Sequence, residues 1–387
     1  MSTMPSPESF SPELRALVSL FGKTTSADLG AIEPRRFITL ARRHKLGPLV
    51  LRKLAEHGIH HSVIQTRLQK GLDDAKPRAL RTNLEIGLLA DLAQKAGIPL
   101  IIAKGPVLSK TLYGRADLKT SADLDWFTLP ETMPQLTTLL QQQGYAHPYA
   151  ALKMSPRKLQ ALYEAQHDIP FTHPARGIPN EVHWSFGTNQ QGISPRLYQQ
   201  SISRAQTLRW GEHTISVFTN EDLFLYLCFH GAKHFWARLN WLVDVNEMIT
   251  NQAALNLNLP AVQAAAQEYQ LTHCLTQTYD LCHSLFGTPL PQATPQPSKH
   301  RAWLTQKALE EIASDSPETQ TTRRVRYFSH LLYDQRLSSS WKSSARFLWQ
   351  QRYKTEDLLL LDLPDKLFFL YTLLRPYFWL RKKLAKK

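Results

Sequence analysis

Two aspartates, one residue apart, are the first side chains whose spacing points to chemistry. Asp123 and Asp125 lie in the segment SADLDWF, whose alternation of polar and apolar residues predicts a β-strand. Residues i and i+2 of a strand point to the same side, so both carboxylates should face one small volume. They would raise each other's pKa unless a cation lay between them. Mg²⁺ prefers such oxygens, so the pair predicts a magnesium site; two solvated aspartates on an edge strand are the alternative.

A third carboxylate follows on another predicted strand. The segment NEVHW places Glu181 and His183 on one face of that strand. We expect Glu181 either to complete the metal site of Asp123 and Asp125 or to accept a proton as a general base. A solvent-facing glutamate is the alternative interpretation.

Basic residues near the aspartates could hold an anion. Lys104 and Gly105 end the apolar run IPLIIAKG, which is typical of a buried strand. Glycine at a strand-to-helix turn lets the backbone approach a phosphate, and the following helix offers free N–H groups. Arg115 and Lys119 lie between this turn and the aspartates, so they are candidates for binding triphosphate oxygens. The alternative for both is ordinary surface charge.

Two histidines four residues apart share one face of a predicted helix. His230 and His234 lie in the sequence HGAKH, which lacks the glutamate of the HExxH zinc motif. We therefore expect this helix to line the nucleotide site rather than to bind zinc. Histidines in the core or at an interface are the alternative.

The elements that must position these residues follow from hydrophobic periodicity. Residues 1–97 read as helical, and residues 98–218 mix short strands with helices. Helices return over residues 219–387, most clearly as one helix over 220–249, and resume after a proline-rich loop at 288–300. The sequence therefore predicts an α+β fold, in which a mixed-sheet core is flanked by N-terminal and C-terminal helical regions.

The composition limits the partners. The chain has 387 residues and a net charge of +14, which favours anionic partners such as nucleotides or an acidic membrane. There is no specific nucleic-acid motif such as an RRM or KH signature. The three cysteines form no close pair, which favours reduced thiols and a cytoplasmic location. No secretory signal and no apolar stretch long enough to span a bilayer is present.

The C-terminal segment combines aromatic and basic residues. Residues 366–387, in DKLFFLYTLLRPYFWLRKKLAKK, carry interfacial rings followed by lysines and arginines. Peripheral contact with an anionic membrane is one interpretation of this tail. The other is a terminal helix docked on the domain.

The motifs together resemble a known family. The run AKGPVLSKTLYGRADLKTSADLDWF, followed by NEVHW, is similar to the uncharacterised nucleotidyltransferases of the polymerase-β-like nucleotidyltransferase superfamily. The likeness extends over roughly residues 80–250. The matching positions are Lys104, Gly105, Tyr113, Arg115, Asp123, Asp125, Glu181, His183, His230, His234, Trp241 and Asp244.

The resemblance implies transfer of a nucleoside monophosphate from an NTP such as ATP to an acceptor hydroxyl, with two Mg²⁺ ions. Asp123, Asp125 and Glu181 would be the catalytic and metal-binding residues. The nucleotide would be held by Lys104, Gly105, Arg115, Lys119, His230 and His234. The acceptor is unidentified; an anionic one suits the charge, and relatives are linked to surface-polysaccharide biosynthesis or to peptide modification. A non-catalytic scaffold at the membrane, suggested by the Gly-Pro turn, and a phosphotransferase are the alternatives.

Overall fold

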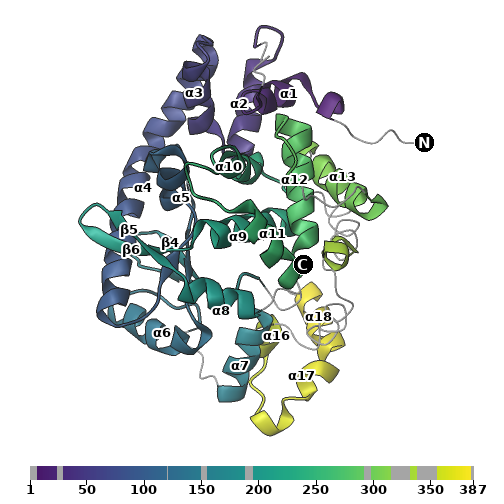
Figure 1. The fold of residues 1–387 in the computed structure, drawn as a ribbon. Coiled ribbons are helices and arrows are strands. Elements are labelled where there is room, and N and C mark those ends of the chain that lie inside the picture. The colour runs from purple at the N-terminus through teal and green to yellow at the C-terminus, as the bar shows by residue number, and fades with distance from the viewer. Residues whose placement is uncertain are drawn as a thin grey trace.

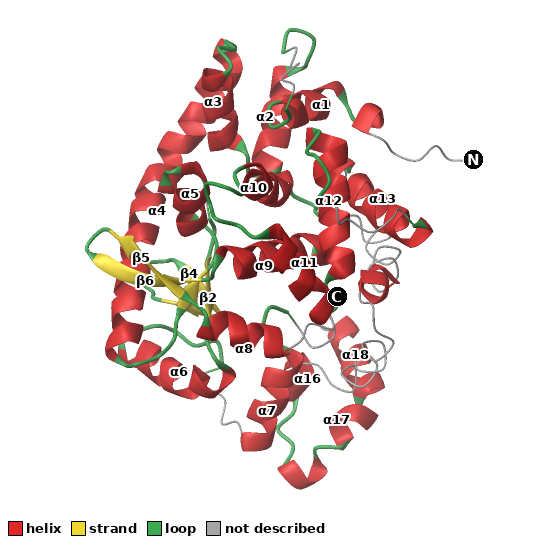
Figure 2. Cartoon of the chain, in the orientation of Figure 1, coloured by secondary structure: helices red, strands yellow, loops and turns green. Residues whose placement is uncertain are grey.

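A six-stranded mixed sheet surrounded by helices forms the centre of the molecule (Figures 1 and 2), which confirms the predicted α+β class. The computed structural model describes residues 7–23, 29–119, 121–149, 155–187, 195–291, 298–314, 332–337 and 355–384. The strands lie in the order β3-β4-β2-β1-β6-β5. They are β1 (Ile101–Ile102), β2 (Leu124–Phe127), β3 (Asp168–Thr172), β4 (Pro179–His183), β5 (Gln206–Trp210) and β6 (His213–Val217).

The sheet register sets the acidic residues side by side. β2 runs parallel to β4, with Asp125 opposite Glu181 and Phe127 opposite His183. β1 is antiparallel to β2 and parallel to β6. β3 and β4 pair antiparallel, as do β5 and β6, so each pair forms a hairpin. The carboxylates of Asp125 and Glu181 therefore lie at directly paired positions of two central strands, and the register of the sheet fixes this pairing.

In the part of the chain that the structure describes, four α-helices precede the sheet, and the longest runs alongside it (Figure 1). Its buried face packs Ile86 and Leu89 against Ile102, Trp126 and Val182 of the sheet. The helices are α1 (Pro12–Ser19), α2 (Pro34–Arg43), α3 (Gly47–Glu56) and α4 (Ser62–Lys95). α2 and α3 are separated by a short turn at 44–46, which becomes part of the site described below.

Shorter helices connect the strands. Gly105 precedes the first of them with φ +65°, and Pro106 occupies its first turn, where a missing N–H breaks no helical hydrogen bond. The helices are α5 (Pro106–Tyr113), α6 (Met133–Gln142), α7 (Pro156–Ala165) and α8 (Pro195–Ser203). Three-residue 3-10 turns lie at Ala116–Leu118 and Pro130–Thr132.

The single helix predicted over 220–249 is wrong. The chain forms α9 (Asn220–Lys233) and α10 (Leu239–Thr250), joined by a turn in which Phe235 and Trp236 both have positive φ. Trp236 is fully buried against Gly231, where an added Cβ would lie 2.2 Å from the indole ring. Apolar residues continue through the turn, so their periodicity gives no sign of the break.

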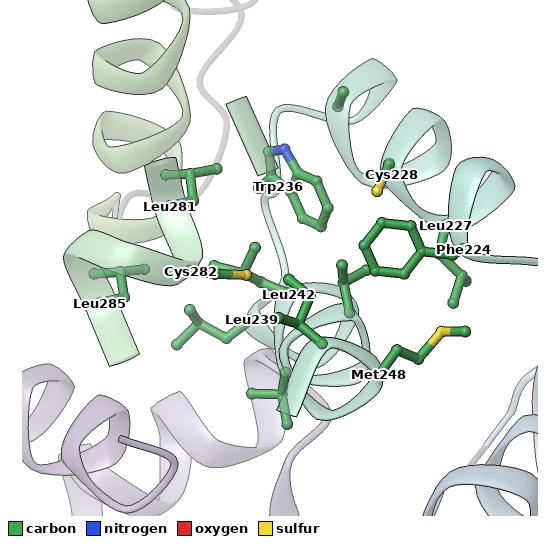
Figure 3. Packing of buried hydrophobic residues seen from close by; sticks show 14 of the residues in the cluster. Phe224, Leu227, Cys228, Trp236, Leu239, Leu242, Met248, Leu281, Cys282 and Leu285 are labelled. Carbon is green, nitrogen blue, oxygen red and sulfur yellow. The ribbon is translucent and has the colours of Figure 1, made fainter. Parts of the chain in front are cut away.

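The main core joins all three regions of the chain. Leu17 of α1, Phe127 of β2 and Leu242 of α10 belong to one buried cluster. Figure 3 shows α9 and α10 packing against α12 through side chains such as Phe224 and Leu281. The remaining helices here are α11 (Leu259–Glu268), α12 (Thr272–Phe286) and α13 (Lys299–Ala313). Of the predicted loop at 288–300, residues 292–297 lie outside the described residues.

The C-terminal tail docks against α7. Phe368, Tyr371 and Phe378 are buried there with Ala161. The tail comprises α16 (Thr355–Leu360), a 3-10 turn (Asp365–Leu367), α17 (Leu370–Leu373) and α18 (Arg375–Leu384). Across the described part of the chain, no helix combines the length and apolar character needed to cross a bilayer.

Candidate functional site

A cavity of about 450 Å³ opens beside the central strands, which is within the usual range for small-ligand sites. Its walls come from the α2-α3 turn, the β1-α5 turn, β2, β4 and the α9-α10 turn. It is lined by Lys45, Lys104, Gly105, Leu108, Lys119, Ser121, Ala122, Asp123, Asp125, Glu181, Leu227, His230, His234, Arg238, Asn240, Trp241 and Asp244. Every predicted site residue except Arg115 is among them.

Asp125 is the most constrained carboxylate of the cavity. One oxygen lies 3.1 Å from Lys104 Nζ, and the other lies 3.1 Å from His183 Nε2. Burial would raise the pKa of Asp125, but Lys104 and His183 outweigh it and hold the pKa well below its usual range. Asp125 is therefore ionised, as a metal ligand must be.

Glu181 lies beside Asp125, and its pKa is shifted in the opposite direction. Burial, together with the nearby negative charges of Asp125 and Asp123, raises the pKa of Glu181 to about 7. The donor atoms of Asp125, Glu181 and His183 lie within 4.8 Å of one another, in a geometry that could hold a metal ion. This crowding of negative charge is what a divalent cation would relieve, so the residues present fit the predicted metal.

Asp123 reaches the same cavity from a different backbone position. β2 begins at Leu124, so Asp123 precedes the strand rather than sharing its face with Asp125. The Ser121 hydroxyl lies 3.3 Å from the Asp123 carboxylate and donates to its backbone carbonyl. Asp123 is half-buried and lines the cavity, but it is not in the cluster of closely spaced donors.

The predicted cations are already matched with carboxylates. Lys119 Nζ donates to Asp244, whose other oxygen accepts a 2.8 Å bond from Tyr113, and this pair is buried. Arg115 lies outside the cavity and makes an exposed two-point ion pair with Asp117. The structure brings Lys104 and Lys119 to the cavity and leaves Arg115 at the surface.

The two histidines lie together at the end of α9. The rings of His230 and His234 are 4.8 Å apart between centroids, and both approach Trp241. His234 caps α9, and burial lowers the pKa of His230 well below its usual value, so that ring is neutral. A neutral imidazole and an indole offer the aromatic contacts that a nucleobase could use.

Sequence reasoning missed three residues as site residues. His183 matched the family pattern but was assigned no role, although its position on β4 beside Glu181 was visible. Lys45 lines the cavity from the α2-α3 turn, and Arg238 lines it from the α9-α10 turn. Nothing in the local sequence indicates that these two cations, almost two hundred residues apart, would meet.

A comparison with protein families agrees with this geometry. The family model described as "Uncharacterised nucleotidyltransferase" matches residues 30–287, which include the cavity's lining residues. No curated protein and no solved structure matches the chain.

Proposed function

The chain belongs to the uncharacterised nucleotidyltransferase family, and from this premise we propose that it transfers a nucleoside monophosphate from an NTP to an acceptor hydroxyl. The observation that carries the proposal is the meeting of Asp123, Asp125 and Glu181 in one basic-rimmed cavity. Acidic residues beside cations are what a metal-bound triphosphate requires.

Each carboxylate has a role in this proposal. Asp123, Asp125 and Glu181 would hold two Mg²⁺ ions, which activate the acceptor hydroxyl and stabilise the leaving pyrophosphate. Lys104 keeps Asp125 ionised and oriented, and His183 fixes its other oxygen. Where Glu181 is not the third metal ligand, its raised pKa suits it instead to accept the hydroxyl proton.

The nucleotide would lie between the Gly105 turn and the histidines. Gly105 has φ +65°, which lets the backbone bend toward the cavity beside Ser121. Lys119, which is paired with Asp244, lines the same cavity, while His230 and His234 are placed to contact the base or sugar. We retain ATP as the first nucleotide to test.

The acceptor is proposed only by class. The net charge of +14 favours an anionic acceptor, for which a sugar of a surface polysaccharide is one example. The three cysteines are buried and unpaired, in keeping with the proposed cytoplasmic location. Contact of residues 366–387 with an anionic membrane would bring the enzyme to a lipid-linked acceptor.

The test is incubation of the protein with Mg²⁺, a cell extract and each of four labelled NTPs in turn. Mass identification of the labelled product distinguishes a nucleotidyl adduct from the much lighter phosphoryl adduct of a phosphotransferase. Asp123→Asn and Asp125→Asn should abolish labelling while the fold survives. Labelling that persists in both variants, or none in any reaction with the wild-type protein, would overturn the proposed function.

A further inference from the structure

The cations that line the cavity fall into two sets according to their partners. Lys104 lies 3.1 Å from Asp125, and Lys119 is buried against Asp244. Each of these lysines is neutralised by a carboxylate, and moving it onto a phosphate would leave that carboxylate unpaired at a cost. Neither is therefore available as a free binding charge.

Lys45 and Arg238 form the second set. Both line the cavity, and within the described ranges neither makes an ion pair with a carboxylate. Both side chains are half-buried, so water screens their charges less than it would at the surface. Two unneutralised cations facing one cavity repel each other and attract an anion.

The backbone holds these two cations in place. Lys45 has φ +54°, and the N–H of Leu46 donates to Ala41 O at 2.8 Å, which closes the end of α2. Such a left-handed helix end usually carries glycine, so a lysine there is unusual. The left-handed backbone at this position therefore carries a charged side chain to the cavity, whereas glycine would place no side chain there.

A buried hydrogen bond ties this turn to the start of α10. His44 Nδ1 accepts a 3.1 Å bond from the N–H of Leu239, so the residues that flank Lys45 and Arg238 are fastened together. Burial lowers the pKa of Lys45, and Arg238 lowers it further, while Asp123 raises it. The two cations line the same cavity as Asp123, a proposed metal ligand.

We propose that Lys45 and Arg238 bind the polyphosphate chain of the nucleotide, and that the lysines beside the carboxylates do not. This assignment rests on the proposed function, because it names how that site recognises its NTP. It makes the N-terminal helical region part of the site. The affinity for a nucleotide should then increase from AMP to ADP to ATP, and substitution of Lys45 or Arg238 should reduce this increase.

The experiment measures the dissociation constants of ATP, ADP and AMP in Mg²⁺ for the wild-type chain, Lys45→Met and Arg238→Met. Loss of one charge-assisted contact should weaken ATP roughly 10- to 100-fold while AMP changes less than about threefold. Lys70→Met and Arg196→Met are matched controls, because their side chains are 71% and 72% exposed, and they should leave all three affinities unchanged.

Circular dichroism and a melting curve establish that each variant is folded, and Lys45→Gln replaces Lys45→Met if the latter is not. ATP affinities that stay within about threefold of wild type in the folded variants would overturn the assignment. If the wild-type chain binds none of the nucleotides, the assignment and the proposed function both fail. If it binds ATP as expected but transfers no nucleotide, only the proposed function fails.

Discussion

At the residue scale, the cavity is built from charges that depend on one another. Lys119 and Asp244 have side chains only 9% and 2% exposed, so each is the other's main compensation for lost water. Asp125 and Lys104 likewise compensate each other for the loss of water. Such pairs contribute to the shape of the site, and removing one member is costlier than removing both.

Asp244→Asn should lower the free energy of unfolding by about 3–5 kcal/mol, because Lys119 is left buried and charged. Urea denaturation measures this loss. The double variant Lys119→Met/Asp244→Asn, in which the amide oxygen can still accept from Tyr113, should recover most of it. Asp74→Asn, which breaks an exposed pair with Lys70, is the control and should cost less than about 1 kcal/mol. A loss for Asp244→Asn no larger than that control would contradict this account of the pair.

His44 should make the stability depend on pH. Burial lowers its pKa from 6.5 to about 3, with Arg43 and Arg238 acting in the same direction. Below pH 6.5 the unfolded chain therefore binds a proton that the folded chain does not. Wild-type stability should fall by up to about 1.4 kcal/mol per pH unit from pH 6.5 towards pH 3.

The comparison is with His44→Asn, whose side-chain oxygen can still accept from Leu239 but does not titrate in this range. Urea unfolding at pH 7.0 and pH 5.5 (chosen to bracket the unfolded pKa) should give a smaller acid loss for the variant. Equal losses for the two proteins would show that His44 is not the titrating group.

At the element scale, turns between helices and strands contribute many of the residues that line the cavity. The α9-α10 turn exists because Trp236 folds back over Gly231 and donates to Gln277 at 3.3 Å. This packing places His234 and Arg238 at the cavity.

Gly231→Ala should cost about 1–3 kcal/mol of stability, since a Cβ there would overlap the indole of Trp236. Gly71→Ala, in an exposed part of α4 where the nearest atom is 3.8 Å away, should instead stabilise by about 0.5–1 kcal/mol. Thermal unfolding of both variants is the measurement. Equal melting temperatures would mean that the turn tolerates the added methyl group.

Sequence patterns predicted the elements better than the turns. The two hairpins, α5 and the strand of Asp125 follow from period-two or helical spacing, which local residues determine. The break at Trp236 and the partnership of Arg115 with Asp117 depend on packing and on which neighbours a side chain reaches. Residues far apart in sequence meet through such contacts, so Lys45 could not be placed beside Arg238 in advance.

At the scale of the whole molecule, the family match covers α2 to α12 and the sheet, while α1, α13 and the tail lie beyond it. The tail buries one set of apolar side chains against α7 and leaves another exposed. The exposed set is Leu367, Phe369, Leu373, Tyr377 and Leu380, each between 42% and 66% exposed. Exposed apolar side chains and basic residues such as Lys366 and Arg381 are the residue types that the proposed contact with anionic lipid requires.

Leu373→Asp/Tyr377→Asp should reduce sedimentation with phosphatidylserine-containing vesicles by at least about tenfold, because it adds charge to the apolar surface. Leu80→Asp/Leu84→Asp on α4 is the matched control, since both leucines are 63% exposed but lie far from the tail in sequence. Vesicles of phosphatidylcholine alone should bind the wild type weakly. Binding that is unaffected by the tail substitutions would contradict the proposed membrane contact.

The central claim is that the carboxylates around Asp125 hold a divalent metal with which an NTP binds. Calorimetric titration of the wild-type protein with ATP, first in Mg²⁺ and then in EDTA, tests it most directly. We predict saturable binding in Mg²⁺, at least about tenfold weaker binding in EDTA, and loss of this difference in Asp125→Asn. Equal affinity in Mg²⁺ and EDTA, or no binding in either, would contradict the account.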